Sequence, residues 1–311
     1  MRPGSAGPTL LLVLAVGAAL PARAQQLEPR AYSPAPVGAN FFGAAYANSQ
    51  GDVVFDPSLP FKNVSANVNT AGLFYSGTLG LWGRGASLGA SLPYSWGVIQ
   101  GDVGETFNRI TRSGLGDAGI RFACNIVGGP ALSPKEFAAR KPTTTFGASL
   151  TVTAPTGQYD GAKLINIGTN RWAFKPELGV SQPLGKFWLE FYAGVWFFTT
   201  NHDFFGGQTR QQDPMAAVQA HLSYTFIPRL WLALDGTWYG GGETTVDGVA
   251  SADRQNNSRV GLTLAVPVSK AHALKFGYAR GATTRIGAKL DTISVAWQFL
   301  WFNRPKAVKA Q

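Results

Sequence analysis

Between residues 38 and 302 the chain alternates apolar and polar side chains, in segments of about 10 to 14 residues. Gly, Pro, Asn or Asp bounds each segment, and these residues favour turns. No segment keeps an apolar stripe with a 3.6-residue period over three turns, so helices are not expected. The pattern predicts about twelve strands, near 38–49, 69–82, 85–99, 114–126, 143–155, 171–183, 186–199, 214–227, 229–241, 258–267, 272–281 and 289–302.

The segment 186–199 shows the alternation clearly. Phe187 and Leu189 share one face, whereas Lys186 and Glu190 share the other. A transmembrane barrel strand presents apolar side chains to lipid and polar ones to the lumen. Most of the nine Trp residues fall near predicted strand ends, where outer-membrane barrels carry aromatic girdles. A soluble β-sandwich also has many short strands, but it does not need Trp there. We therefore predict an all-β, transmembrane antiparallel up-and-down β-barrel.

The connections between the predicted strands alternate between tight and long. The tight ones lie at 83–84, 184–185, 228 and 268–271, and the longer, polar ones at 50–68, 100–113, 156–170, 200–213, 242–257 and 282–288. Outer-membrane barrels have short periplasmic turns and longer external loops, with both termini in the periplasm. The segment 127–142 is the exception, and we expect a long turn or a short periplasmic helix at Pro134–Arg140 there.

Both ends of the chain lie outside the predicted barrel of residues 38–302. Arg2, the apolar stretch 9–20 and Ala22-Arg23-Ala24 predict a cleaved signal peptide over residues 1–24. Residues 25–37 are then expected to form a periplasmic N-terminal segment, and residues 303–311 a basic, solvated tail. No later apolar run reaches eighteen residues, so a transmembrane helix is not expected.

Composition narrows the function classes. With 12% aromatic and 14% charged residues, the chain is expected to fold, and its 38 glycines favour β structure. The single cysteine, Cys124, allows no internal disulfide and is expected to be a small lipid-facing residue. Lys and Arg are scattered, which argues against a nucleic-acid partner. His202, His221 and His272 are not at ligand spacing, so we expect no metal and no cofactor.

Four stretches carry a resemblance to a known family. They are Leu27–Phe42 (LEPRAYSPAPVGANFF), Asp56–Pro60 (DPSLP), Gly114–Gly119 (GLGDAG) and Ala154–Asp160 (APTGQYD). Together they resemble the outer-membrane proteins of the "meta-pathway of phenol degradation" family. The resemblance implies a barrel in the outer membrane of a Gram-negative bacterium that takes up small aromatic or other apolar compounds. Its expected partners are outer-membrane lipid, such a solute and the barrel-assembly machinery.

The stretch Gly114–Gly119 also fits the dinucleotide pattern G-x-G-x-x-G. That pattern requires a following helix, whereas here the alternating Ile120 and Phe122 follow. A glycine-rich start of a strand is therefore the better interpretation.

Side-chain parity places a set of ionisable groups in the lumen, namely Asp117, Arg121, Lys175, Glu177, Glu190, His221, Asp235, Arg259 and Lys275. Buried charges must be paired, so the acids and bases are expected to form a structural network that can also select solutes. A barrel of this size is expected to be narrow or partly plugged. In the external loop, His202, Phe204 and Phe205 are candidates for solute capture.

Passive uptake without enzymatic activity is the function we favour, and two alternatives stay open. In the first, Ser223, His221 and Asp235 supply the nucleophile, base and orienting acid of an outer-membrane lipid hydrolase. Parity directs these side chains to the lumen, which lipid does not reach. The second alternative is a closed barrel with a structural or surface-interaction role.

Overall fold

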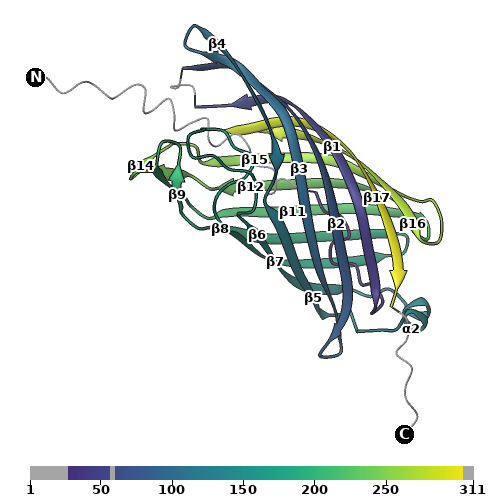
Figure 1. The fold of residues 1–311 in the computed structure, drawn as a ribbon. Helices are drawn as coiled ribbons and strands as arrows, with labels where there is room; N and C mark the ends of the chain where they lie inside the picture. The colour runs from purple at the N-terminus through teal and green to yellow at the C-terminus, as the bar shows by residue number, and fades with distance from the viewer. Residues whose placement is uncertain (1–26, 57–59, 304–311) are drawn as a thin grey trace, which may run out of the picture.

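The computed structural model describes residues 27–56 and 60–303. These residues form a closed antiparallel barrel and one short helix, α2 (Figure 1). Twelve strand positions make up the wall, because β4 and β5 both pair with β3 as successive pieces of one position. Within the described part of the chain, no helix has the length and apolar composition needed to cross a membrane. The predicted signal peptide and nearly all of the predicted tail lie outside the described residues.

The barrel strands follow one another around the wall in chain order. Their bounds are β1 (Ala39–Val54), β2 (Phe61–Leu81), β3 (Arg84–Val103), β4 (Thr106–Leu115), β5 (Ala118–Val127), β6 (Thr145–Ala154), β7 (Ala173–Leu184), β8 (Phe187–Phe198), β11 (Met215–Ile227), β12 (Leu230–Gly241), β15 (Gln255–Pro267), β16 (His272–Thr283) and β17 (Gly287–Phe302). The first and last strands close the cylinder by pairing from Ala39↔Phe302 to Val54↔Gly287. Full closure leaves this seam without a free sheet edge.

One end of the barrel carries the tight turns and the other carries the long loops, and we name them the turn end and the loop end. Helix α2 (Pro134–Ala139) lies at the turn end (Figure 1). The Ser133 side chain caps its first turn, and Glu136 bonds back to the Ser133 backbone. The long connection therefore contains a helix, which is one of the two alternatives that the sequence leaves open.

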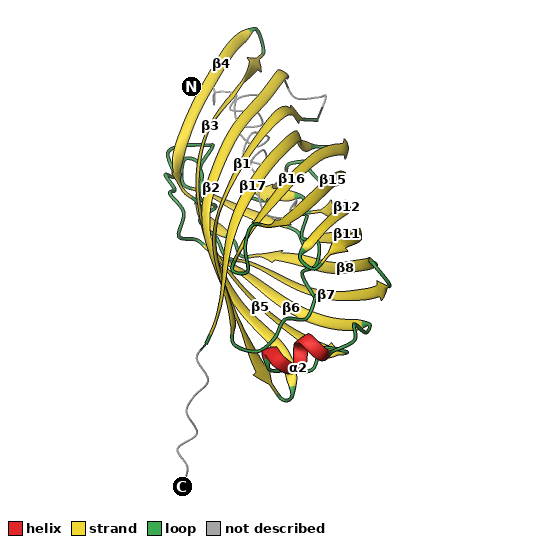
Figure 2. Cartoon of the chain, turned by 90° about the vertical axis from the view of Figure 1, so that its right-hand side faces the viewer, coloured by secondary structure: helices red, strands yellow, loops and turns green. Residues whose placement is uncertain are grey.

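The loop end differs from prediction on one side of the barrel. The predicted loops 50–68 and 100–113 are largely extensions of β1, β2, β3 and β4, which project beyond the neighbouring strands (Figures 1 and 2). Their polar residues suggest loops, but several inward-facing positions are apolar. Ala66, Ile99 and Ile165 pack together there, with the connection after β6 supplying Ile165. Burial of this inner face explains why pairing continues where the sequence suggests turns.

Pro93 divides the fourth strand position into β4 and β5. Strand β3 pairs with β5 up to Ser91 and with β4 from Tyr94 onward. The proline has no N–H to donate to the ladder, and its carbonyl accepts a 2.8 Å hydrogen bond from Gly116 N. The break therefore lies within the stretch Gly114–Gly119, which supports its assignment as a strand element rather than a nucleotide site.

The loops after β8 and β12 form a second, four-stranded sheet at the loop end. Its strands are β9 (Asn201–Phe204), β10 (Gln208–Gln212), β13 (Thr244–Val246) and β14 (Val249–Ala250). Strand β10 pairs with both β9 and β13, so two loops distant in sequence support each other.

Candidate functional site in the barrel lumen

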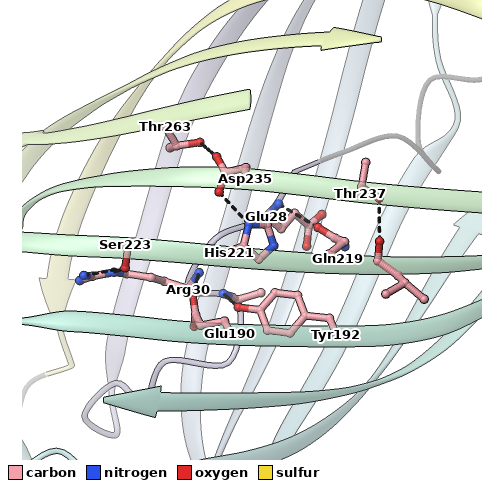
Figure 3. Close-up of polar contacts among 12 residues, drawn as sticks. Glu28, Arg30, Glu190, Tyr192, Gln219, His221, Ser223, Asp235, Thr237 and Thr263 are labelled. Carbon is pink, nitrogen blue, oxygen red and sulfur yellow. Dashed lines mark hydrogen bonds and ion pairs between the residues drawn. The ribbon is translucent and has the colours of Figure 1, made fainter. Parts of the chain in front are cut away.

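The N-terminal segment is the main difference between prediction and structure. Residues 25–37 are predicted to lie in the periplasm, but the described part, from Leu27 onward, lies inside the barrel (Figure 3). Glu28 N donates to Gln219 Oε1 on β11 at 3.1 Å, and Arg30 N donates to Glu190 Oε2 on β8 at 2.8 Å. Polar groups on the inner wall thus replace water as hydrogen-bond partners of the segment, so its backbone can be buried in the lumen.

Arg30 binds the segment to β11 and to two aromatic rings. Its guanidinium donates to Ser223 Oγ and to Thr225 Oγ1 on β11. The same group lies 4.6 Å from the ring centroid of Trp231 and 5.6 Å from that of Trp188. Hydrogen bonds and cation–π contacts together satisfy a charge held within the lumen.

Tyr32 lies on two glycines of the wall. Its hydroxyl is 2.8 Å from Ser149 Oγ and donates to Glu177 Oε1 at 3.1 Å. The ring covers Gly147 on β6 and Gly179 on β7, where a Cβ would collide with it. Close approach of a ring to the backbone requires glycine at these two positions.

Several predicted lumen charges are brought together on β5 and β7. Lys175 Nζ lies 2.9 Å from Glu177 Oε2, and Arg121 Nη2 lies 3.9 Å from Glu177 Oε1. Arg121 also lies over the Tyr32 ring at 5.1 Å. Glu190, the neighbouring acid on β8, accepts from Ser181 Oγ at 2.8 Å and from the N-terminal segment. These groups form a network that includes the internal segment as well as the wall.

His221 and Asp235 face each other across β11 and β12. His221 Nδ1 lies 2.7 Å from Asp235 Oδ1, and Thr263 Oγ1 donates to Asp235 Oδ2 at 2.6 Å. Ser223 is fully buried and accepts from Arg30, whereas His221 Nε2 is buried without a hydrogen-bond partner among the described residues. A nucleophile–base pair requires a hydrogen bond between the base and the nucleophile. Among the described residues, no such bond joins His221 Nε2 to Ser223 Oγ.

The remaining predicted lumen charges lie further around the wall. Arg259 on β15 is buried and donates to Thr292 Oγ1 and the Leu290 carbonyl on β17. Lys275 on β16 remains exposed to the lumen, with its Nζ 5.7 Å from the Trp231 ring centroid. These contacts place both residues on the inner face of the barrel.

Asp117 has a different role from the other predicted lumen residues. Its carboxylate accepts from Gly157 N at 2.9 Å, from Thr169 N at 3.0 Å and from Thr169 Oγ1 at 2.6 Å. Asp117 follows the break between β4 and β5, and Gly157 belongs to the stretch Ala154–Asp160. Two stretches that carry the family resemblance are thus in direct contact, and they fix the loop after β6 over the barrel.

Strands β16, β17, β1, β2 and β3 line the lumen with small side chains. Lys275, Ala296, Ala45 and Gly72 follow one another in register across these strands, so they share the inner face. The alternate positions carry large exposed residues such as Leu73 and Trp297. We name the following residues the small-residue wall: Gly277, Ala279, Thr292, Ser294, Ala296, Ala45, Ala47, Ser49, Thr70, Gly72, Gly89 and Ser91. None of these residues is buried.

The external-loop candidates are placed in the second sheet. Phe204 is only 4% exposed and packs against Val246, with the Arg210 guanidinium over its ring. Phe204 therefore stabilises the loop sheet. The prediction that it is available to capture a solute is wrong, because the ring is buried. His202 is exposed and Phe205 is half-buried.

A basic residue of the loop end is also buried beside this sheet. Arg171 donates to Gln212 Oε1. Burial, reinforced by the nearby charge of Arg210, lowers the pKa of Arg171 to about 9. The loop end is thus held by desolvated polar contacts rather than by an apolar core alone.

Sequence reasoning missed the lumen residues that the N-terminal segment contributes, Glu28, Arg30 and Tyr32. It also missed the glycines that Tyr32 covers. A usable indication exists in the sequence, because Leu27–Phe42 is one of the four stretches that carry the resemblance, and most of it precedes the first predicted strand. A stretch with such specific residues is more typical of a packed segment than of a solvated linker.

Comparisons with known proteins agree on family and fold. Residues 43–297 match the family described as "Putative MetA-pathway of phenol degradation". The COG4313 outer membrane channel from Pseudomonas putida F1 has a similar structure, with a TM-score of 0.74 and 22% identity over 89% of this chain and 100% of that one.

Two further solved structures have lower scores. The transport unit of the autotransporter AIDA-I from Escherichia coli matches with a TM-score of 0.49 and 10% identity over 96% of this chain and 97% of that one. A deltaS2S3 mutant of the TodX monoaromatic hydrocarbon channel matches with a TM-score of 0.47 and 12% identity over 86% and 91%. No curated protein sequence matches the chain.

Proposed function

The chain belongs to the MetA-pathway of phenol degradation family, and on this premise we propose that it is a passive uptake channel for small apolar or aromatic compounds. The family description, the outer-membrane channel fold and the aromatic rings in the lumen support this function. In this proposal the barrel lies in the outer membrane of a Gram-negative bacterium, where the barrel-assembly machinery inserts it. The turn end and both termini then face the periplasm.

One observation carries the proposal, namely that the small-residue wall stays accessible while the opposite wall is packed. On β6–β15, lumen groups such as Glu190, His221 and Asp235 are at most about 1% exposed. Across the lumen, the facing positions are Ala, Gly, Ser and Thr and remain partly exposed. Short side chains leave volume inside a twelve-stranded barrel, and this volume provides a path along the wall.

The hydrolase alternative has less support. Ser223 Oγ is bound by Arg30, and the His221 nitrogen that a base would use is not hydrogen-bonded to it. The catalytic candidates also face the lumen rather than lipid. We therefore propose that Ser223, His221 and Asp235 do not act as a catalytic triad and that the protein is not an enzyme.

Single-channel conductance in planar bilayers, combined with benzyl alcohol uptake by proteoliposomes, tests the channel function. Wild-type protein is expected to show discrete openings and solute entry. Ala296→Trp places a large ring on the small-residue wall and should lower both by roughly half or more. Ala44→Trp is the matched control, because Ala44 pairs with Trp297 on the outer face and should leave both unchanged. Silent bilayers and impermeable vesicles for correctly inserted wild-type protein would favour the closed structural barrel.

A further inference from the structure

We propose that the lumen contains a binding site for small organic carboxylates and that the Glu28 side chain is its built-in occupant. The inference rests on the proposed channel function and narrows its solutes to anionic aromatic compounds. The site consists of Arg121, Lys175, His221 and Lys275, which come from four different strands.

Glu28 is held where these basic groups converge. Its backbone N–H is fixed by Gln219, and the preceding Leu27 covers Gly261 of β15, where a Cβ would lie 2.6 Å from Leu27 Cδ1. The carboxylate lies within electrostatic range of Lys175, Arg121, Lys275 and His221. Figure 3 shows Glu28 beside His221 and Gln219. The Glu28 carboxylate is thus the one acid of the N-terminal segment near these four basic side chains. Of the four, His221 is charged only when it is protonated.

The acids of the wall do not satisfy this cluster fully. Glu177 pairs with Lys175 and Arg121, and Asp235 pairs with His221. Lys275 has no carboxylate within 4 Å among the described residues. Three nitrogen atoms of the cluster are buried and have no hydrogen-bond partner among the described residues, namely Arg121 Nε, Arg121 Nη2 and His221 Nε2. Buried unsatisfied donors are costly, and a carboxylate offers two oxygens that can accept several hydrogen bonds.

Aromatic groups beside the cluster favour a carboxylate that carries a ring. Tyr32 and Tyr192 make an edge-to-face contact with centroids 4.9 Å apart, and Tyr192 lies 5.1 Å from the His221 ring. Lys275 connects the cluster to the accessible path, because its register partner on β17 is Ala296 of the small-residue wall. A solute moving along that wall therefore meets Lys275 at the edge of the site.

Isothermal titration calorimetry on the refolded full-length protein in detergent tests the site, with benzoate as the probe and neutral benzamide as its isosteric control. Glu28→Gln removes the resident charge and should bind benzoate about tenfold more tightly than wild type. Glu28→Asp keeps the charge and should resemble wild type. Glu105→Gln is the matched control for the loss of one acid, since Glu105 is exposed in the β3–β4 turn, and it should change nothing.

Lys275→Gln provides a second measurement that does not depend on Glu28→Gln folding. It should weaken benzoate binding about tenfold, in wild type as in the Glu28→Gln background, and leave benzamide unaffected. Equal benzoate affinity of folded Glu28→Gln and wild type would overturn the site, as would an equal gain for benzamide. Benzoate affinity unchanged by Lys275→Gln would also count against it.

Conductance separates failure of the site from failure of the channel. Tight benzoate binding by Glu28→Gln in a barrel that never conducts would retain the site and reject the proposed channel function. Discrete wild-type openings together with no benzoate preference in any variant would retain the channel and reject the site.

Discussion

The two walls of the lumen are built from the same antiparallel sheet, yet they perform different tasks. On β6–β15, Lys175 pairs with Glu177 and His221 with Asp235, all four are buried, and Glu177 also binds Tyr32 of the N-terminal segment. On β16, β17 and β1–β3, positions such as Ser91 and Ala296 stay accessible and contact no internal segment in any described hydrogen bond. Alternation alone makes both walls polar inside, but side-chain size decides which wall is filled.

This difference suits the proposed channel, because the segment inside the barrel is held mainly by one wall. Charges on the packed wall hold residues from Leu27 onward by hydrogen bonds, and glycines receive the Tyr32 ring. Because the segment is held on one side, we place the proposed path on the other side. Substitutions on the packed wall test this comparison. They should change the free energy of unfolding or the conductance more than similar substitutions on the small-residue wall.

The largest effect is expected for Asp235→Ala. Asp235 is 1% exposed and accepts from His221 and Thr263, so its removal leaves buried polar groups without their acceptor. Removing one partner of a buried pair costs roughly 3–5 kcal/mol. The free energy of unfolding, measured by urea titration in lipid vesicles, should fall by that amount. Asp235→Asn retains an acceptor and should lose less, and equal losses would show that charge rather than hydrogen bonding dominates.

An intermediate effect is expected for Gly179→Ala. The added Cβ would meet the rings of Tyr32 and Tyr192, so the segment must move, and overpacking of this kind costs about 1–3 kcal/mol. Single-channel conductance should rise if the segment leaves its place. The Tyr32→Ala background should remove most of the cost, because the nearer of the two rings is gone. Gly236→Ala is the control, since the nearest atom to its Cβ lies 3.9 Å away.

The smallest effect compares one serine from each wall. Ser149→Ala removes one of the hydrogen-bond partners of the buried Tyr32 hydroxyl and should lower the free energy of unfolding by about 1 kcal/mol. Ser294→Ala lies on the accessible wall and should stay within about 0.5 kcal/mol of wild type. Equal changes in the two urea titrations would contradict the distinction between the walls.

The strand pattern could be predicted well from sequence because each lipid-facing position must be apolar. Segments such as 187–198 and 230–241 lie within two residues of their predicted bounds. The error at 50–68 and 100–113 arose because strands beyond the membrane contain Asn, Gln and Asp on their outer face. These residues continue the sheet because the inner face of the strands packs against Ile165, and the sequence does not reveal this contact.

The candidate site could be predicted only in part. Parity in each strand places Arg121, Lys175, His221 and Lys275 inside the barrel, because a side chain's face depends on local alternation alone. Parity gives the face of a side chain but not how close it lies to side chains of other strands. It could therefore not show that these four groups lie near Glu28. It also treats Phe204 as an exposed loop residue, although the loop sheet buries it.

By itself, the sequence determined a membrane-type β-barrel, its approximate strand number and the inner and outer face of each strand, since these follow from two-residue periodicity. Tertiary structure decided that Leu27, Glu28, Arg30 and Tyr32 enter the lumen and that the residues of the small-residue wall stay accessible. Hydrogen bonds between residues more than 140 positions apart hold the segment, and no local pattern encodes such contacts.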